Sequence, residues 1–389
     1  MKKRFLALLL AGTMSLSLVA CGGGSKETTT ETTTTETTTE ATTEDTASEE
    51  TTTTETTTEA ATEAPEQSVV TWNYGSSGNV LVTIANEKGY FAEEGITIEP
   101  VAATANADAM SLLASGKVNV VSNAGTSNPL QQIAQGVDIT VFGGHMIEGC
   151  MPVVALPDTE WNGIESFLGE KVAVNPSYFA FTGAVMEAGA EDPMTAVEWT
   201  VFSSYDDALV AVQKGEVKYA LMGTGQNLAV QQLAAQGDIK IVSYQSEIME
   251  NYSCCRMVAQ TSWVNENPNT VKAICRALLR AQAYYEANKE EAVTLHAAAI
   301  EATDEYVAAY MLDDVHYFVS VDPLKDGVVR AWGILDATGY LGEDCQIDIL
   351  DHINTDLYAE ALAEATELYG AENPDFYAAQ LAFFNEHNK

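Results

Sequence analysis

The chain has 389 residues and a formal net charge of −38, because 56 acidic residues face only 18 basic ones. Such an acidic surface repels nucleic acid, which needs a basic footprint, and it disfavours direct docking on anionic lipid. About 320 residues of ordinary composition follow the first 66, which is more than one hydrophobic core usually supports, so two lobes are expected.

The first twenty residues have the layout of a secretory signal. Basic residues at positions 2–4 precede an apolar run that ends at Ala20. This run contains too few strongly apolar residues to form a stable membrane span. The run ends in Leu18-Val19-Ala20-Cys21-Gly22, which resembles a bacterial lipobox. We therefore expect removal of residues 1–20 and lipidation of Cys21, which would hold the protein at the outer face of the cytoplasmic membrane. An ordinary signal peptide with a coincidental cysteine is the alternative.

A spacer follows the lipobox cysteine, so that residues 21–66 are expected to form a lipidated, unstructured stalk. From about residue 25 it consists almost wholly of Thr, Glu and Ala and has no large apolar residue to bury. Such a segment has nothing to offset the entropy lost on ordering, so disorder is predicted. A stalk of this kind suits a Gram-positive cell, whose surface proteins stand off the membrane within a wall.

The first unit of the folded part alternates apolar strands with amphipathic helices. Expected strands occupy residues 69–74, 96–101, 118–121 and 139–143, and expected helices 79–87, 105–115 and a segment ending at 135. The pattern restarts with strands at 151–156, 171–175, 197–202, 218–222 and 239–244 and helices at 164–168, 179–188, 205–213 and 226–235. A strand at 252–259 and helices at 271–287, 357–368 and 376–385 follow. This order predicts parallel α/β sheets with helices on both faces.

The five cysteines after Cys21 do not form a regular framework. They are Cys150, Cys254, Cys255, Cys275 and Cys345. An odd count without regular spacing argues against structural disulfides, and no Cys/His spacing suggests a zinc site. Adjacent Cys254 and Cys255 would point to opposite faces of a strand, so a bond between them would be strained. We expect no metal and no cofactor.

An ordered set of local patterns carries a family resemblance. Residues 85–96, Ala-Asn-Glu-Lys-Gly-Tyr-Phe-Ala-Glu-Glu-Gly-Ile, are similar to a signature of extracytoplasmic solute-binding proteins. Further similarities follow in the expected order at 112–120, 164–174 and 208–220, with a strand at Cys254-Cys255-Arg256. The chain thus resembles the nitrate/sulfonate/taurine and thiamine-precursor binding proteins of ABC importers. Asn119, Lys218 and Gly223-Thr224 depart from the family pattern, which weakens any transfer of ligand identity.

The resemblance implies a type II periplasmic-binding-protein fold, with two α/β lobes joined by two crossing strands and a helical C-terminal region. We expect lobe 1 to contain residues 67–156 and 246–389 and lobe 2 residues 157–245, with crossings near residues 156–157 and 244–252. The resemblance also implies a protein that captures a small solute and delivers it to an ABC permease and ATPase complex. We expect a monomer with no nucleic acid partner.

In α/β sheets of this kind, ligands gather beyond the carboxyl ends of the strands. That rule selects the segments 75–79, 122–127, 144–148, 175–182 and 223–226, all rich in Gly, Ser, Thr or Asn. Helix caps and turns are the competing explanation for any one of these residues. The candidate ligand-binding residues are Ser76, Ser77, Gly78, Asn79, Asn123, Ala124, Gly125, Thr126, His145, Ser177, Tyr178, Phe179, Thr182, Gly223 and Thr224.

Two ligand classes stay open at this point. Helix N-termini suit a sulfonate, a nitrate-like anion or a zwitterion such as taurine. Aromatic residues near the loops, including Trp72 and Tyr178, suit a thiamine-precursor pyrimidine or a similar heterocycle. A pyrimidine-synthase-like enzyme of the same fold is a third reading. It is disfavoured because the sequence has no nucleophile elbow, Walker loop or HExxH motif, so no catalytic residue is expected.

Overall fold

The computed structural model describes residues 62–75, 77–103 and 106–389. The predicted signal, the Cys21 lipidation site, nearly all of the spacer and Ser76 lie outside the described residues. Glu66, assigned to the spacer, belongs to the folded part: its carboxylate accepts hydrogen bonds from the Asn269 and Thr270 amides at 3.1 and 2.8 Å. These amides open helix α11 (Pro268–Ala287), where a negative charge stabilises the helix N-terminus.

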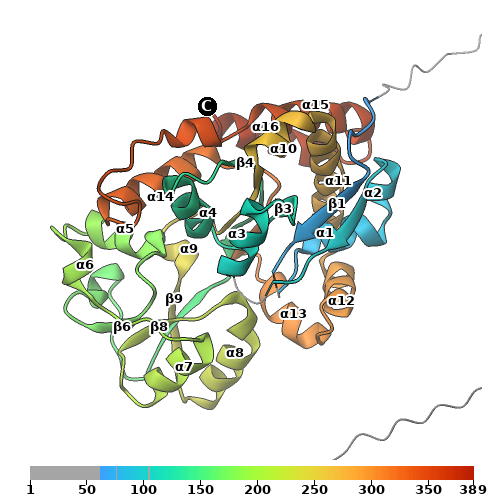
Figure 1. Cartoon of the computed structure of the whole chain (residues 1–389). Coiled ribbons are helices and arrows are strands. Elements are labelled where there is room, and N and C mark those ends of the chain that lie inside the picture. The colour runs from blue at the N-terminus through green and yellow to red at the C-terminus, as the bar shows by residue number, and fades with distance from the viewer. Residues whose placement is uncertain (1–61, 76, 104–105) are drawn as a thin grey trace, which may run out of the picture. The chain divides into compact units, whose positions relative to one another are not determined.

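Two sheets organise the chain from residue 62 onward (Figure 1). We call the part built on each sheet a lobe. The sheet of lobe 1 has the strand order β11-β4-β10-β3-β1-β2, formed by Tyr317–Val319, Ile139–Gly149, Cys255–Gln260, Val120–Val121, Val69–Asn73 and Thr97–Pro100. The sheet of lobe 2 has the order β7-β6-β8-β5-β9, formed by Glu198–Trp199, Lys171–Ala173, Tyr219–Leu221, Pro152–Ala155 and Lys240–Tyr244.

Both sheets are mixed rather than wholly parallel. In lobe 1, β1 pairs in parallel with β2 and β3, whereas β10 is antiparallel to β3 and β4. In lobe 2, β6 is parallel to β7 and β8, and β5 is antiparallel to β8 and β9. The antiparallel strands are those next to the points where the chain passes between lobes, which local periodicity does not reveal.

The chain changes lobes twice, as the resemblance implied. The first passage lies between Gly149 at the end of β4 and Pro152 at the start of β5. It is therefore earlier than the expected crossing at residues 156–157, because strand 152–155 pairs in the second sheet. The return passage runs from Tyr244 through the short helix α9 (Gln245–Ile248) to Cys255. The precise extent of each lobe remains our proposal.

Helices cover both sheets. Those before β10 are α1 (Val80–Glu87), α2 (Tyr90–Glu93), α3 (Asn106–Ala114), α4 (Ser127–Ala134), α5 (Phe179–Glu187), α6 (Pro193–Ala196), α7 (Tyr205–Gln213) and α8 (Asn227–Gln236). Those after it are α10 (Thr261–Glu266), α11, α12 (Lys289–Ala299), α13 (Asp304–Met311), α14 (Lys325–Ala337), α15 (Asp356–Tyr369) and α16 (Pro374–His387). Short 3₁₀ turns occur at Ile164–Phe167, Thr224–Gln226 and Ile349–His352.

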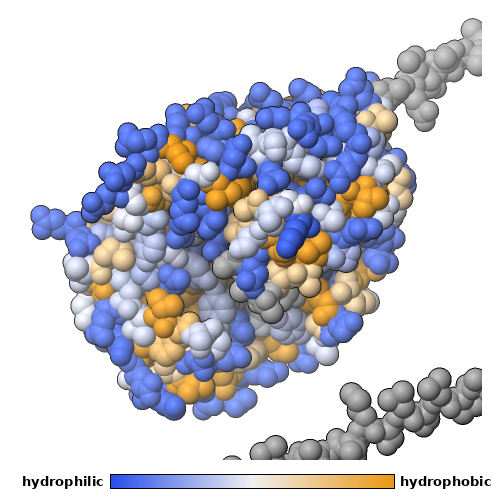
Figure 2. Space-filling view, viewed as in Figure 1, coloured by the Kyte–Doolittle hydropathy of each residue, from blue (hydrophilic) through white to orange (hydrophobic). Residues whose placement is uncertain are grey.

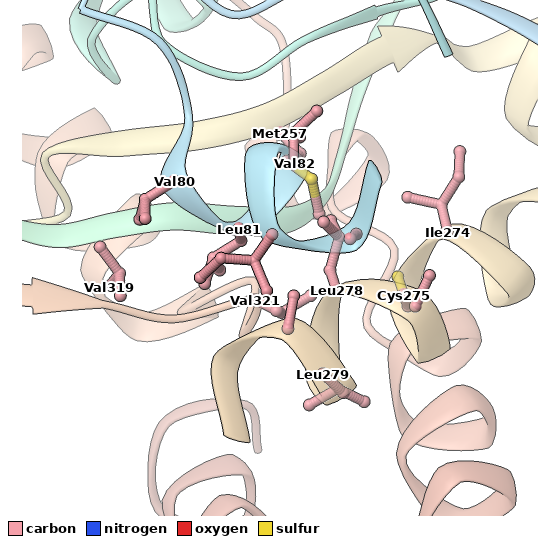
Figure 3. Close-up of a cluster of buried hydrophobic side chains, with 14 of the residues drawn as sticks. Val80, Leu81, Val82, Met257, Ile274, Cys275, Leu278, Leu279, Val319 and Val321 are labelled. Atoms are coloured by element: carbon pink, nitrogen blue, oxygen red, sulfur yellow. The ribbon is translucent and has the colours of Figure 1, made fainter. Parts of the chain in front are cut away.

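The core of lobe 1 forms where α1 meets α11 against the sheet. Leu81 of α1 and Leu278 of α11 are fully buried, and both pack near Val321 (Figure 3). Helix α11 also contacts α15, so it is enclosed on several sides and nearly all of its apolar residues are buried. Burial of each such side chain contributes about 1.5–3 kcal/mol to stability.

Helix α14 connects the two lobes through apolar contacts. It packs on α4 of lobe 1 and α5 of lobe 2. Val328, Ala331 and Leu335 of α14 are fully buried in the same cluster as Phe179 and Phe181 of α5. The C-terminal region therefore closes one side of the space between the lobes.

Candidate ligand-binding site

A cavity of about 490 Å³ lies between the lobes. Its size falls in the range of small-molecule sites. Residues of both lobes form its wall: Gly75, Ser77, Asn123, Ala124, Gly125, Thr126, Ser127, Asn128, Met146, Met151, Tyr178, Phe179, Tyr205, Gly223, Thr224, Gly225, Gln226, Gln245, Tyr252, Ser253, Cys254, Cys255 and Tyr306.

Asn123 organises the lobe 1 side of the cavity. Its amide nitrogen donates to the Ser77 hydroxyl at 3.0 Å and to the Gly78 carbonyl at 2.8 Å. The loop approaches Asn123 closely because Gly75 has a positive φ of 70°, and a Cβ there would lie 3.2 Å from the Asn123 carbonyl oxygen. The loop after β1 and the loop after β3 are thereby held side by side.

Two tyrosines form much of the lobe 2 side. The hydroxyls of Tyr178 and Tyr205 lie 3.0 Å apart and share a hydrogen bond. Burial raises the pKa of both phenols, so both are neutral at physiological pH. Gly223 leaves space for Tyr205, since a Cβ at this position would lie 2.5 Å from the Tyr205 ring.

Contacts across the cavity hold the lobes together. The Ser127 hydroxyl of α4 donates to the Ser177 carbonyl at 2.6 Å, and the Asn227 amide donates to the Cys150 carbonyl at 2.7 Å. The Tyr306 hydroxyl of α13 approaches Gly225 so closely that a Cβ there would overlap it. The two lobes therefore contact each other beside the cavity.

The return passage supplies the floor of the cavity. The Tyr252 hydroxyl accepts a hydrogen bond from the Gly149 amide at 2.7 Å, which ties this passage to the first one. Cys254 and Cys255 follow, with their sulfur atoms 3.7 Å apart. The expectation that these side chains point to opposite faces is wrong, because the two sulfur atoms lie this close together and both residues line the cavity.

No charged side chain lines the cavity among the described residues. The wall offers hydroxyls, amides, thiols, two methionines and five aromatic rings. Three helices also begin at the wall, namely α4, α5 and α8, and no side chain within the described part caps their first turns. Helices away from the wall do have such caps, for example α6 through Asp192 and α16 through Asn373. The backbone amides at the N-termini of α4 and α5 can thus serve a bound molecule. At α8 the Asn227 backbone amide already donates to the Thr224 carbonyl of the preceding 3₁₀ turn.

His145 does not line the cavity. The segment 144–148, expected to be a loop, is the second half of β4, which is buried along its whole length. His145 is 2% exposed, and neither ring nitrogen has a hydrogen-bond partner among the described residues. Burial lowers the pKa of His145 to about 3, and the nearby His296 and Arg256 add to the effect, so the imidazole is neutral.

The structure places most of the other candidate residues at the wall. Those that line it are Ser77, Asn123, Ala124, Gly125, Thr126, Tyr178, Phe179, Gly223 and Thr224. Four candidates besides His145 do not, and each has a structural position instead. Gly78 packs against His296, Asn79 caps α1, the Ser177 carbonyl binds Ser127, and Thr182 bonds to the Phe179 carbonyl inside α5.

Several wall residues were missed by the sequence reasoning. Tyr205 follows β7 at the same sheet edge as the selected loops, so the strand-end rule could have found it. Tyr252, Cys254 and Cys255 were assigned to an ordinary strand at 252–259, whereas β10 begins only at Cys255. Tyr306 comes from a helix far along the chain, and no local pattern indicates its place.

Two further findings concern the described residues. No helix there is both long and apolar enough to cross a membrane. No group of three or more His, Cys, Asp or Glu side chains in that part is arranged to hold a metal ion.

Comparisons with known proteins agree with this architecture. The nitrate-binding protein NrtA from Synechocystis PCC 6803 superposes with a TM-score of 0.63 at 17% identity, covering 80% of this chain and 92% of that one. The alkanesulfonate-binding protein SsuA from Xanthomonas axonopodis pv. citri, bound to MOPS, superposes with a TM-score of 0.59 at 14% identity. The match covers 75% of this chain and 99% of that one. The desulfurization enzyme DSZB superposes with a TM-score of 0.55 at 13% identity, and the match covers 76% of this chain and 99% of that one.

These likenesses show that the chain has the periplasmic-binding-protein fold expected from the sequence. No curated protein matches the sequence. The model of the family described as NMT1/THI5 like matches residues 79–292, which is more than half of the chain. This segment begins at the first helix of the folded part and ends in α12. The chain belongs to the NMT1/THI5-like family.

Proposed function

We propose that this protein is the substrate-binding component of an ABC importer, which captures a small solute between its lobes and delivers it to a membrane permease. The cavity, which is walled by both lobes and flanked by the hydrogen bond between Ser127 and Ser177, supports this role. A solute that touches both lobes stabilises the closed form relative to the open one, which gives the permease a signal that loading has occurred. The signal-like start and the lipobox-like motif support an extracytoplasmic, lipid-anchored location, and we propose that the protein acts as a monomer.

For the ligand we propose a neutral, planar heterocycle, such as an aminopyrimidine. The observation that carries this proposal is the cavity wall, which has five aromatic rings and no charged side chain in the described part of the chain. Flat rings stack on aromatic side chains, and hydroxyls and amides satisfy the polar edge of a heterocycle. The strongly acidic chain also disfavours the approach of an anion.

A monoanion such as an alkanesulfonate, taurine or nitrate is the second candidate. The uncapped N-termini of α4 and α5 favour it, because free amides and helix dipoles stabilise one negative charge without a basic side chain. The names of NrtA and SsuA agree with this class, although likeness at their level of identity concerns the fold alone.

Titration calorimetry with aminopyrimidines, taurine, alkanesulfonates and nitrate tests the ligand class. We expect a heterocycle to bind with an affinity that changes little between about 0.02 and 0.5 M salt, since a neutral ligand has no charge to screen. Tight binding of a sulfonate or of nitrate, weakening with salt, would replace the first candidate by the second. Turnover of a bound compound would overturn the receptor assignment, and DSZB shows that this fold also occurs in an enzyme.

A further inference from the structure

The cavity wall contains two adjacent free thiols. Cys254 and Cys255 both line the cavity, and their sulfur atoms lie at hydrogen-bond distance, 3.7 Å. Cys254 is partly exposed and Cys255 is buried. Neither the binding of a neutral solute nor the packing of the lobes requires a thiol pair at this place.

The backbone at the start of β10 brings the two side chains together. Ser253, just before the pair, has a left-handed backbone with φ of 60°, and the pairing of β10 with β4 shifts register between Cys255 and Arg256. Irregularities of this kind redirect side chains that would otherwise alternate. Gly149 provides the room, since a Cβ there would lie 2.8 Å from the Cys254 sulfur.

The surroundings give the two thiols different reactivity. The hydrogen bond with the Cys255 thiol, together with the Tyr252 hydroxyl and the charge of Arg256, lowers the pKa of Cys254. The same pair interaction and burial raise the pKa of Cys255. Cys254 is therefore the better nucleophile, and Cys255 is placed to react second. By contrast, burial raises the pKa of Cys275 to about 12.

We propose that Cys254 and Cys255 form a reversible oxidation site, which a small disulfide compound converts into a disulfide between neighbouring residues in the cavity wall. The Cys254 thiolate attacks one sulfur of the oxidant and expels the first thiol. The Cys255 sulfur, on losing its proton, then attacks the Cys254 sulfur and expels the second thiol. Two S–H bonds are lost, one S–S bond forms, and the two electrons and two protons leave with the reduced oxidant.

The resulting bond is readily reversed. Neighbouring Cα atoms are about 3.8 Å apart, which is shorter than the usual span of a disulfide, and strain of this kind makes a disulfide easier to reduce. Oxidation also removes the single Cys255 thiol proton, for which the Cys254 sulfur at 3.7 Å and the Asn123 side-chain oxygen at 3.3 Å are alternative acceptors. Because Asn123 holds the loop of Ser77 and Gly78, the change reaches the wall of the binding cavity.

Oxidation of the folded full-length protein with glutathione disulfide tests the proposal. After denaturation, alkylation of free thiols and digestion, we expect the peptide with Cys254 and Cys255 to be unalkylated and lighter by two hydrogen atoms. Cys275 should be alkylated, and dithiothreitol should restore the pair. Cys255→Ser should instead stop at a glutathione adduct on Cys254. A wild-type pair that stays alkylatable, or that stops at the same adduct as Cys255→Ser, would overturn the proposal.

Phenylarsine oxide provides a second measurement that needs no oxidant. This compound condenses with two neighbouring thiols and releases water, so one adduct is expected by intact mass on the wild type. Cys345→Ser should keep this adduct, whereas Cys254→Ser and Cys255→Ser should each lose it. Failure of the wild type to form an adduct would show that the thiols do not share an accessible face, which contradicts the proposal. Neither measurement uses the solute, so the outcome is separate from the receptor assignment.

Discussion

The cavity and the outer helical side of lobe 1 differ in their content of charged side chains. The cavity wall has no charged side chain among the described residues. On the other side, α11 binds its neighbours through Arg276, which contacts Glu94 after α2 and Glu364 of α15. Arg280 of the same helix pairs with Glu93 and lies over the Tyr90 ring. We call Glu93, Glu94, Arg276, Arg280 and Glu364 the helical ion-pair cluster.

This difference shows where a strongly acidic protein uses its few basic residues. Arg276 is 1% exposed and Glu94 is 9% exposed, so both charges are removed from water and depend on each other. On the face in Figure 2, hydrophilic residues cover most of the periphery. Arg276 thus attaches α11 to α15 and to the residue after α2, and the cavity is left to neutral groups.

Removing the arginine of the helical ion-pair cluster should have the largest effect. Arg276→Ala leaves the Glu94 carboxylate buried without its partner, which costs about 3–5 kcal/mol of unfolding free energy. Urea unfolding followed by circular dichroism measures this change. Lys88→Ala is the matched control, because it breaks a pair with the exposed Glu291 and should cost less than about 1 kcal/mol. Equal losses in the two variants would contradict the distinction between buried and exposed pairs.

Acid should destabilise the protein through histidines buried next to the cavity. Burial lowers the pKa of His145 to about 3 and of His296 to about 4, against 6.5 in the unfolded chain. Between these values the unfolded chain binds protons that the folded one does not, so stability falls as pH falls below about 6.5. Each histidine should account for about 2 kcal/mol between pH 7 and pH 5.

Unfolding by urea at several pH values measures this loss. His145→Leu, which removes an imidazole without hydrogen-bond partners, should show a smaller decrease between pH 7 and pH 5 than the wild type. A pH profile of the variant that is parallel to that of the wild type would mean that His145 is not the group responsible.

The loops of the cavity were easier to predict than its floor. Asn123, Thr126, Tyr178 and Gly223 follow strands whose apolar runs are plain in the sequence, and the strand-end rule places them correctly at the cavity. Only the first half of the long strand β4 was expected, as a strand at 139–143, because Gly144 after Gly143 was interpreted as the start of a loop. In the structure these glycines allow close contact with residues 320–322, since a Cβ on Gly144 would lie 2.6 Å from the Ser320 carbonyl.

The floor depends on features that no local pattern reveals. The alternation rule assigns Cys254 and Cys255 to opposite faces, and only the irregular start of β10 places both at the cavity. The contact of Tyr306 with Gly225 joins residues from different lobes. Positions set by tertiary contacts of this kind require the whole fold to be known.

Loss of an aromatic ring from the cavity should weaken binding of a planar ligand. If the ligand is a planar heterocycle, Tyr178→Ala should raise its dissociation constant about tenfold, because stacking on an aromatic ring contributes about 0.5–1.5 kcal/mol beyond buried area. Tyr178→Phe keeps the ring and removes only the hydroxyl bonded to Tyr205, so it should stay within about threefold of the wild type. Calorimetry gives both values, and equal weakening by the two variants would favour a ligand bound through the hydroxyl.

A smaller effect is expected where the lobes touch. Gly225→Ala places a methyl group against the Tyr306 hydroxyl, which disfavours the closed form and should raise the dissociation constant of the ligand several-fold. The added Tyr306→Phe substitution removes that hydroxyl oxygen and should restore affinity in the double variant. Because both single changes lie at the lobe contact, a double-mutant cycle measures their coupling. Additive effects would mean that the methyl group acts elsewhere, for example on the turn at Thr224–Gln226, and not on closure of the lobes.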